Sequence, residues 1–399
     1  MLLTLEALPA RHGDALLLHC GKTSDPDHYI IDGGWKNVYD NDLKPRLESL
    51  RGSKPTLPIR LLMVSHVDED HITGIVDMTA ELRDQVQNKK PVSYKIASVW
   101  HNSFDDILEN GAKTLSQAGT SVLSAASANA VAGLDIPLGE DAAIRLAGVA
   151  QGRTLRDDAK FLGCAVNKDG NKGLMTVAAA PVEITTGVKI RVVGPGPDQV
   201  EELRKEWDKY LDKKKLGVST AGVELAQYLD ESAPNLSSIV AHVECGGKEI
   251  LFTGDARGDF ILEGMEKTGL LPAGGTRHLS VLKVPHHGSD RNIETEFFKR
   301  LPADHYIFSA DGEYGNPDLT TFQMLFKARS GDTKPFTIHL TYDPATYRKD
   351  SKKDLAYPLA KLKALFKARK DAGQVFTVNF PSGPGKFVRI DLLDAYTGP

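Results

Sequence analysis

Short apolar runs recur along the chain, and most of them end in glycine or in charged residues. The runs predict strands, at residues 2–7, 15–20, 29–31, 59–64, 94–101, 188–193, 238–244, 249–252, 282–284, 306–309 and 336–342. Apolar residues at helical spacing predict helices near residues 42–50, 200–211 and 355–366. This alternation of strands and helices predicts an α/β fold made of two similar halves.

Glycine and proline mark the predicted turns. Gly246-Gly247 predicts a hairpin between the strands at 238–244 and 249–252. The run Pro381-Ser382-Gly383-Pro384-Gly385 predicts a second hairpin close to the end of the chain. Lysine, glycine and serine at residues 213–222 predict a flexible connection.

Two segments depart from the main pattern. Residues 103–187 are rich in Ala, Ser and Gly, with few aromatic side chains, so we expect an inserted helical lobe there. Residues 331–399 follow the last of the motifs described below, and we expect them to form a C-terminal extension that packs on the same domain. The domain itself should span residues 1–330.

The composition is that of a globular protein. The chain has 399 residues, of which 41% are hydrophobic, enough for a sizeable core. Its formal net charge of −4 excludes a global basic field, so local basic clusters or metal ions would have to hold any polyanion. No stretch approaches the roughly 18 apolar residues of a membrane span, and we expect a cytoplasmic protein without a membrane part. The three cysteines form no C-x-x-C pair, which fits a reducing compartment.

The run His66-Val67-Asp68-Glu69-Asp70-His71 carries most of the chemical information. It follows the predicted strand at 59–64 directly, and an open sheet places its chemistry at the carboxyl ends of its strands. We expect one metal to take His66 and Asp68 and a second to take Asp70 and His71, while Glu69 stays in solvent. Imidazoles combined with carboxylates suit Zn²⁺ or Mn²⁺.

Two later strand ends complete this set of ligands. Thr253-Gly254-Asp255 follows one predicted strand, and Pro285-His286-His287-Gly288-Ser289 follows another. Asp255 is placed to bridge two cations, and His286 or His287 to close the second site. Each cluster alone is compatible with ordinary loop residues, but three of them at strand ends predict a metal centre.

The motifs His-x-Asp-x-Asp-His, Thr-Gly-Asp and His-His-Gly-Ser resemble those of the metallo-β-lactamase fold superfamily. Within it, they are most similar to the hydrolase domain of the competence protein ComEC and its soluble relatives. Four further matches occur in the same order along the chain: Gly13-Asp14-Ala15, Asp32-Gly33-Gly34, Asn235-Leu236-Ser237-Ser238 and, imperfectly, Tyr314-Gly315-Asn316-Pro317. The resemblance implies a four-layer αββα sandwich, with the helical insertion and the C-terminal extension added to it.

The departures from the superfamily pattern concern the first metal. Asp68 stands where the commonest motif has a histidine. A carboxylate in place of an imidazole raises the preference for Mn²⁺ relative to the Zn²⁺ pair of a lactamase-like site. The usual third histidine of the first site has no clear counterpart, and His101 is a candidate for a ligand or a substrate contact. His242 lies within a predicted strand and is interpreted as a structural residue. Asn316 replaces a histidine of the family motif, so a proton donor is lost, although an amide can still hold a phosphate oxygen.

The predicted function is hydrolysis at two divalent metal ions, Zn²⁺ or Mn²⁺. Asp70 would bind metal and orient a hydroxide, and the ComEC-like resemblance implies a phosphodiesterase or nuclease with a phosphodiester or nucleic-acid substrate. Hydrolysis of an ester, thioester or lactam is an alternative on the same metals, and an inactive binding or regulatory scaffold is another. The candidate substrate contacts are His12, Lys283, His287, Ser289 and Asn316. The sequence leaves the physiological substrate and the oligomeric state open.

Overall fold

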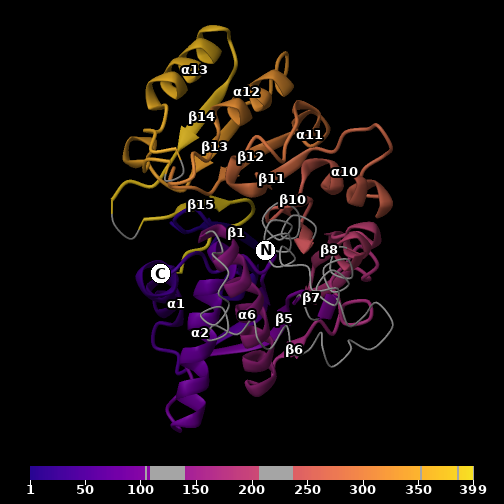
Figure 1. Cartoon of the computed structure of the whole chain (residues 1–399), viewed down its shortest axis with the longest axis vertical. Helices are drawn as coiled ribbons and strands as arrows, with labels where there is room; N and C mark the ends of the chain where they lie inside the picture. The colour runs from indigo at the N-terminus through magenta and orange to yellow at the C-terminus, as the bar shows by residue number, and fades with distance from the viewer. Residues whose placement is uncertain (104–105, 108–139, 206–236, 351–352, 384–385, 399) are drawn as a thin grey trace, which may run out of the picture.

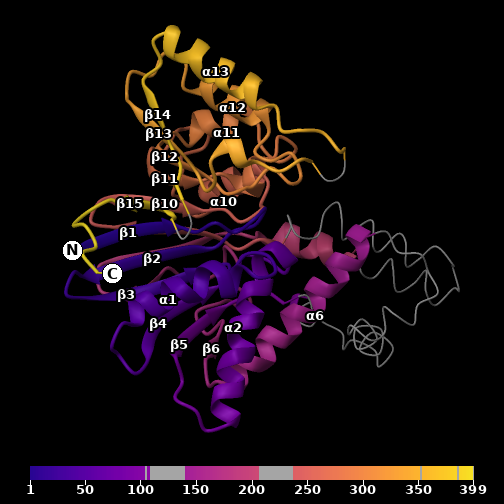
Figure 2. The same ribbon diagram turned by 90° about the vertical axis from the view of Figure 1, so that its left-hand side faces the viewer.

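Two sheets pack face to face in the computed structural model, which describes residues 1–103, 106–107, 140–205, 237–350, 353–383 and 386–398. The first sheet has the strand order β15-β1-β2-β3-β4-β5-β6, and the second has the order β14-β13-β12-β11-β10-β9-β8-β7. Helices α1, α2 and α6 lie on the outer side of the first sheet, and α10 to α13 lie on the outer side of the second (Figures 1 and 2). The predicted four-layer αββα sandwich is confirmed.

The first sheet combines the N-terminal strands with one strand from the end of the chain. Its strands are β1 (Leu2–Ala7), β2 (Leu16–Lys22), β3 (Asp25–Ile31), β4 (Leu57–Met63), β5 (Tyr94–Trp100), β6 (Ala165–Val166) and β15 (Val388–Asp391). The helical segments of this half are η1 (Tyr39–Leu43), α1 (Lys44–Arg51), α2 (Glu69–Gln87) and α6 (Glu140–Phe161). From β3 onwards the neighbouring strands run parallel, so their carboxyl ends share one edge of the sheet.

The second sheet is built in the same way. Its strands are β7 (Val182–Thr185), β8 (Val188–Gly194), β9 (Val240–Cys245), β10 (Lys248–Phe252), β11 (Leu279–Lys283), β12 (Ala303–Phe308), β13 (Phe336–Leu340) and β14 (Phe376–Asn379). The helical segments are α10 (Gly258–Lys267), η2 (Pro285–Gly288), α11 (Thr295–Arg300), α12 (Leu319–Ala328), η3 (Pro344–Thr346) and α13 (Leu359–Asp371). The strands from β10 to β14 run parallel to one another.

Alternation along the strands divides the apolar side chains among three cores. Leu3 and Leu5 of β1 face the second sheet, in a core that also holds Val192 and Val281. Leu17 belongs to the core beneath α1, α2 and α6, and a third core lies beneath α10 to α13. Burial on both faces accounts for the near-continuous apolar character of the strands.

Most of the predicted elements lie within a few residues of their expected bounds, but the prediction of a terminal hairpin is wrong. Residues 381–385 do not join two paired strands, because β14 lies in the second sheet and β15 in the first. A run rich in glycine and proline indicates a turn without indicating which sheet the chain enters next. The hairpin of β9 and β10 is confirmed by their antiparallel pairing.

Two predictions fall partly outside the described residues. The helix expected at 200–211 is present over 197–205, and its remainder lies outside them, as does the connection at 213–222. The expected lobe at 103–187 contains α6, together with β6 and β7, which each extend one of the two sheets. Among the helices that the structure describes, none has the length and apolar character needed to cross a bilayer.

Candidate metal centre

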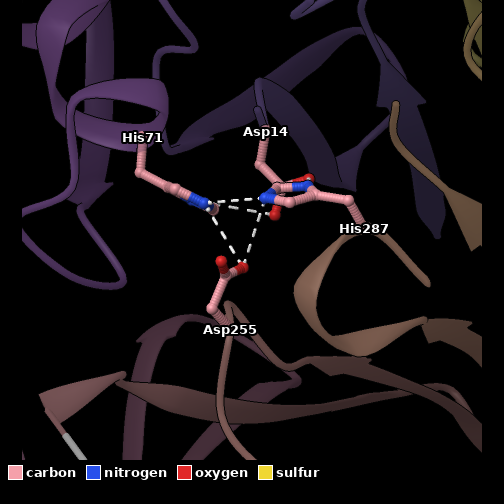
Figure 3. A group of neighbouring side chains, drawn as sticks. All are labelled: Asp14, His71, Asp255 and His287. Carbon is pink, nitrogen blue, oxygen red and sulfur yellow. Dashed lines mark hydrogen bonds and ion pairs between the residues drawn. The ribbon is translucent and has the colours of Figure 1, made fainter. Parts of the chain in front are cut away.

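The predicted metal ligands meet at one edge of the sandwich. The segments that follow β4, β10 and β11 supply them, and the segments after β1 and β3 lie alongside. Figure 3 shows His71, Asp255, His287 and Asp14, which come from the segments after β4, β10, β11 and β1. β3 and β4 are parallel neighbours in one sheet, and β10 and β11 are parallel neighbours in the other. The two sheets therefore present their carboxyl-terminal loops to each other, as open sheets commonly do at a site.

Four histidines direct their Nε2 atoms at the single carboxylate of Asp255. His71 and His287 lie 3.3 and 3.4 Å from its Oδ1. His66 and His286 lie 3.8 and 3.6 Å from its Oδ2. The carboxylate thus has two imidazoles on each oxygen, which is the arrangement expected of a group that bridges two cations.

The aspartates of the His66–His71 run divide in the same way. Asp68 Oδ2 lies 3.7 Å from His66 Nε2, on the Oδ2 side of Asp255. Asp70 Oδ2 lies 3.3 Å from His287 Nε2 and 3.8 Å from His71 Nε2, on the Oδ1 side. The structure therefore forms two donor sets: a first set of His66, Asp68 and His286, and a second set of Asp70, His71 and His287, with Asp255 between them.

Each of the four imidazoles has a polar side-chain atom of another residue next to its Nδ1 atom. His71 Nδ1 lies 2.9 Å from Asp32 Oδ2, and His287 Nδ1 faces Asp14 Oδ1 at 3.5 Å. His66 Nδ1 lies 3.0 Å from Ser65 Oγ, and His286 Nδ1 lies 2.9 Å from Asn292 Oδ1. Such outer partners fix ring orientation in metal sites and leave Nε2 free for the cation.

Close backbone contacts hold these outer partners in place. A Cβ on Gly74 would lie 2.0 Å from the carbonyl oxygen of Gly33, so only glycine lets the first turns of α2 approach the loop after β3. The Gly33 amide donates to the His71 carbonyl oxygen at 2.7 Å. This contact sets His71 beside Asp32.

The two adjacent histidines diverge because of their backbone conformation. His286 and His287 have φ values of 48° and 56°, in the left-handed region that residues other than glycine rarely adopt. The strained turn aims one ring at each oxygen of Asp255. Backbone strain of this kind is concentrated at functional sites, where the surrounding structure holds it.

The electrostatics of the site favour a cation. Burial raises the pKa of Asp255, but His287, His71 and His286 outweigh burial and hold that pKa well below its usual range. Burial lowers the pKa of His71 and of His287, and Asp255 with the other carboxylates raises both well above their usual range. The ionised carboxylates therefore stabilise positive charge at the position of these rings, and a divalent metal ion bound in place of the ring protons would supply that charge.

Four buried atoms among the metal donors and their outer partners lack a hydrogen-bond partner within the described part of the chain: His66 Nε2, Asp255 Oδ1, His287 Nδ1 and Asp14 Oδ1. His66 Nε2 and Asp255 Oδ1 face the space between the histidines. An unpaired buried polar atom costs free energy unless another partner supplies the interaction. Zn²⁺ or Mn²⁺ between the donors would satisfy His66 Nε2 and Asp255 Oδ1, so the residues fit the metal that the sequence predicts.

Asp14 lies close to the second set but has a cationic partner of its own. Asp14, His71, Asp255 and His287 place one ligand atom each within 4.8 Å of one another. Asp14 Oδ2 also lies 2.5 Å from Nζ of Lys283, and both side chains are buried. Because Lys283 neutralises Asp14, we interpret Asp14 as the residue that holds His287, and Lys283 as a structural cation rather than a substrate contact.

The remaining candidates lie around the centre. His101 is buried, and its Nε2 atom lies 3.2 Å from the carbonyl oxygen of Gly152. Ser289 is buried directly after the strained turn, and Asn316 is half-buried in the loop after β12. Glu69 is half-buried, and burial raises its pKa. His12 adjoins the centre and is described below.

The sequence interpretation gave no role to four residues that the structure places behind the ligands: Asp14, Asp32, Ser65 and Asn292. Asp14 and Asp32 lie in motifs that the resemblance singled out, so the signal was present without an assigned function. Asn292 belongs to no motif. Its contact with His286 depends on the path of the loop between η2 and α11, which the sequence pattern does not define.

No family model matches this chain, and a search of curated proteins found no match. Several solved structures share parts of its arrangement. One, called a putative metal-dependent hydrolase, from Parabacteroides distasonis, is 11% identical and covers 83% of this chain and 90% of its own, with a TM-score of 0.32. Zn²⁺-bound PqqB from Methylobacterium extorquens is 10% identical and covers 95% of this chain and 87% of its own, with a TM-score of 0.34. A protein of unknown function from Enterococcus faecalis is 10% identical, covers 96% of this chain and 89% of its own, and has a TM-score of 0.29.

Proposed function

We propose that this protein is a metal-dependent hydrolase whose centre takes two divalent cations. The observation that carries this proposal is the convergence of four imidazole Nε2 atoms on the two oxygens of Asp255, with an aspartate on each side. The bound cations would stabilise negative charge on the reacting group and make water nucleophilic near neutral pH. Two such ions fit because each half of the donor set offers two imidazoles and two carboxylate groups, Asp255 being shared.

The protein's own residues would hold and orient these groups. Asp70 would bind in the second set and orient the attacking water, because its Oδ2 atom faces the His71 and His287 Nε2 atoms. Asp32 and Asp14 would keep the rings of His71 and His287 fixed while charge develops. Fixed dipoles and charges of this kind lower a barrier without reorganising during the reaction.

The substrate that we propose is a phosphodiester, with nucleic acid as the polymeric case. Asp68 adds a carboxylate to the first set, which favours hard cations such as Mn²⁺ and, with them, phosphoryl chemistry. The resemblance to the ComEC-like branch supports the same class. Zn²⁺ and Mn²⁺ are both compatible with imidazole and carboxylate donors, and metal analysis would distinguish them.

The test is cleavage of bis-p-nitrophenyl phosphate and single-stranded DNA by the Mn²⁺-loaded protein. We expect the wild type to cleave both, and Asp70→Ala to lower the rate by at least about 100-fold, since it removes a group that acts on the attacking water. Asp259→Ala, an exposed carboxylate on α10, is the matched control and should leave the rate unchanged. Equal rates for wild type and Asp70→Ala would contradict the proposal.

Two alternatives give different results in the same assay. Cleavage of esters, thioesters or lactams without cleavage of phosphodiesters would retain the metal centre and change the substrate class. Metal binding without turnover of any of these substrates would favour a binding or regulatory scaffold.

A further inference from the structure

His12 lies in a closed environment of its own beside the metal centre. It is only 6% exposed, and its ring lies between Trp35 and Tyr314, with centroid distances of 4.6 and 4.7 Å. Its Nδ1 atom faces Glu313 Oε2 at 3.5 Å. Trp35, Tyr314 and Glu313 thus contact the ring on three sides and fix its orientation. A solvated histidine in a loop would lack such contacts.

The loop that carries His12 packs directly on a predicted metal ligand. A Cβ on Gly13 would lie 1.8 Å from the Asp70 carbonyl oxygen, and the Asp14 amide donates to that oxygen at 3.2 Å. Ser309 Oγ donates to the Gly13 carbonyl oxygen at 2.6 Å. These contacts place the loop that carries His12 directly against the backbone of Asp70, and so beside the metal donors.

The surroundings of Glu313 keep its side chain ionised beside the His12 imidazole. Arg348 Nη1 lies 2.6 Å from Glu313 Oε2, and Arg11 Nη2 lies 3.8 Å from the same oxygen. The contact with His12 lowers the pKa of Glu313 to about 2, against the opposing effect of burial and with the help of Arg348. A carboxylate on one ring nitrogen keeps a proton there and orients the other nitrogen for reaction.

A third cation beside His12 is the competing interpretation. His12, Asp311 and Glu313 place ligand atoms within 4.8 Å of one another. However, both carboxylates already have guanidinium partners: Arg11 and Arg348 each lie 3.7 Å from Asp311 Oδ2. The cluster is therefore compensated for charge without a metal ion.

We propose that the His12–Glu313 pair is the acid of the reaction, with His12 Nε2 giving a proton to the leaving oxygen of the substrate. This inference rests on the proposed phosphodiesterase function. The water oxygen forms a bond to phosphorus and gives up one proton to solvent, and the bond from phosphorus to the leaving oxygen breaks with its electron pair. That oxygen takes the proton of Nε2, and His12 regains one from solvent in place of the proton that the water released, so that one water is added in total. Trp35, which packs on the His12 ring, also lines a cavity of about 500 Å³ together with Glu69 and Thr73.

The test compares two leaving groups in the metal-loaded protein. The p-nitrophenolate of bis-p-nitrophenyl phosphate leaves without a proton, whereas the alkoxide of a thymidine dinucleotide needs one. We expect His12→Gln to lower kcat/KM at least about 100-fold on the dinucleotide and less than about tenfold on the aryl ester, in line with the usual contribution of general acids. His278→Gln, a histidine on the outer surface, is the matched control and should equal wild type on both substrates.

A second variant separates the chemistry from folding. Glu313→Gln leaves the His12 ring and its aromatic neighbours in place, and it should lose activity on the dinucleotide more than on the aryl ester. Metal content should stay equal to wild type in both variants. Equal losses on the two substrates, no loss, or a metal equivalent lost with His12 would overturn the assignment. Failure of the wild type on both substrates would instead contradict the proposed function.

Discussion

Asp255 is the residue on which the interpretation of the site depends most. The residue is 4% exposed and has imidazoles on both oxygens. Ser65, Asp32 and Asn292 form hydrogen bonds with Nδ1 of three of these imidazoles, and Asp14 lies 3.5 Å from Nδ1 of the fourth. We propose that His286 takes the place of the first site's missing histidine. The sequence pattern offered no third histidine between the two halves, and the left-handed turn after β11 brings His286 there instead.

The metal content of variants can show which metal site His286 and His287 each belong to. His286 contributes to the first donor set and His287 to the second, so each single alanine variant should retain about one equivalent of metal where wild type retains two. Asp255→Ala should retain none, because both sets lose their shared carboxylate. Elemental analysis after dialysis would show this, with His278→Ala as the control. His286→Ala with two equivalents would contradict its role as a ligand.

At the scale of elements, a buried ion pair links β1 to α1. Glu6 is completely buried, and Arg46 donates to its two oxygens from Nε and Nη2, both at 2.8 Å. His19 Nε2 lies 3.3 Å from the same carboxylate. Burial raises the pKa of Glu6, but His19 and Arg46 together lower it from 4.5 to about 2. The pair thus attaches α1 to β1 of the first sheet.

This shift predicts the acid sensitivity of the fold. A lowered carboxylate pKa stabilises the folded state above the ordinary value of 4.5, and this contribution is lost as the pH falls towards about 2. Glu6→Gln should remove that part of the pH dependence and lower the free energy of unfolding near neutral pH by about 3–5 kcal/mol, because the Arg46 charge stays buried without a partner. Urea unfolding between pH 2 and 7 would measure both effects.

An exposed carboxylate provides the control for this experiment. Glu296→Gln on α11, where the side chain is 60% exposed, should change the free energy of unfolding by less than about 0.5 kcal/mol. A Glu6→Gln variant with the wild-type slope against pH would show that the buried pair does not govern acid stability.

The sequence was most informative where candidate ligands come directly after a strand in the chain. The His66–His71 run, Asp255 and the His286-His287 pair each lie directly after an apolar strand, and the structure brings all three strand ends together. Long-range partners were harder to foresee. Whether Asp32 reaches His71 depends on how the loop after β3 meets α2, and whether His286 or His287 faces Asp70 depends on two left-handed residues. The terminal hairpin failed for a related reason, since turn residues do not indicate the partner strand.

At the scale of the whole molecule, the two halves supply different parts of one site. The first half gives His66, Asp68, Asp70 and His71, and the second half gives Asp255, His286 and His287. Cations bound between them would connect the two sheets at the edge where their loops meet. Ligands that bind only the folded state stabilise it, so the metal ions should also contribute to the stability of the sandwich. The net charge of −4 adds to the importance of these cations for any anionic substrate.

The most direct test of the dinuclear centre is the metal content of the wild-type protein purified without chelator and dialysed against Mn²⁺ or Zn²⁺. Two donor sets that share Asp255 predict two equivalents per chain. One equivalent would contradict the bridging role of Asp255, and none in the presence of excess metal would contradict the metal centre itself.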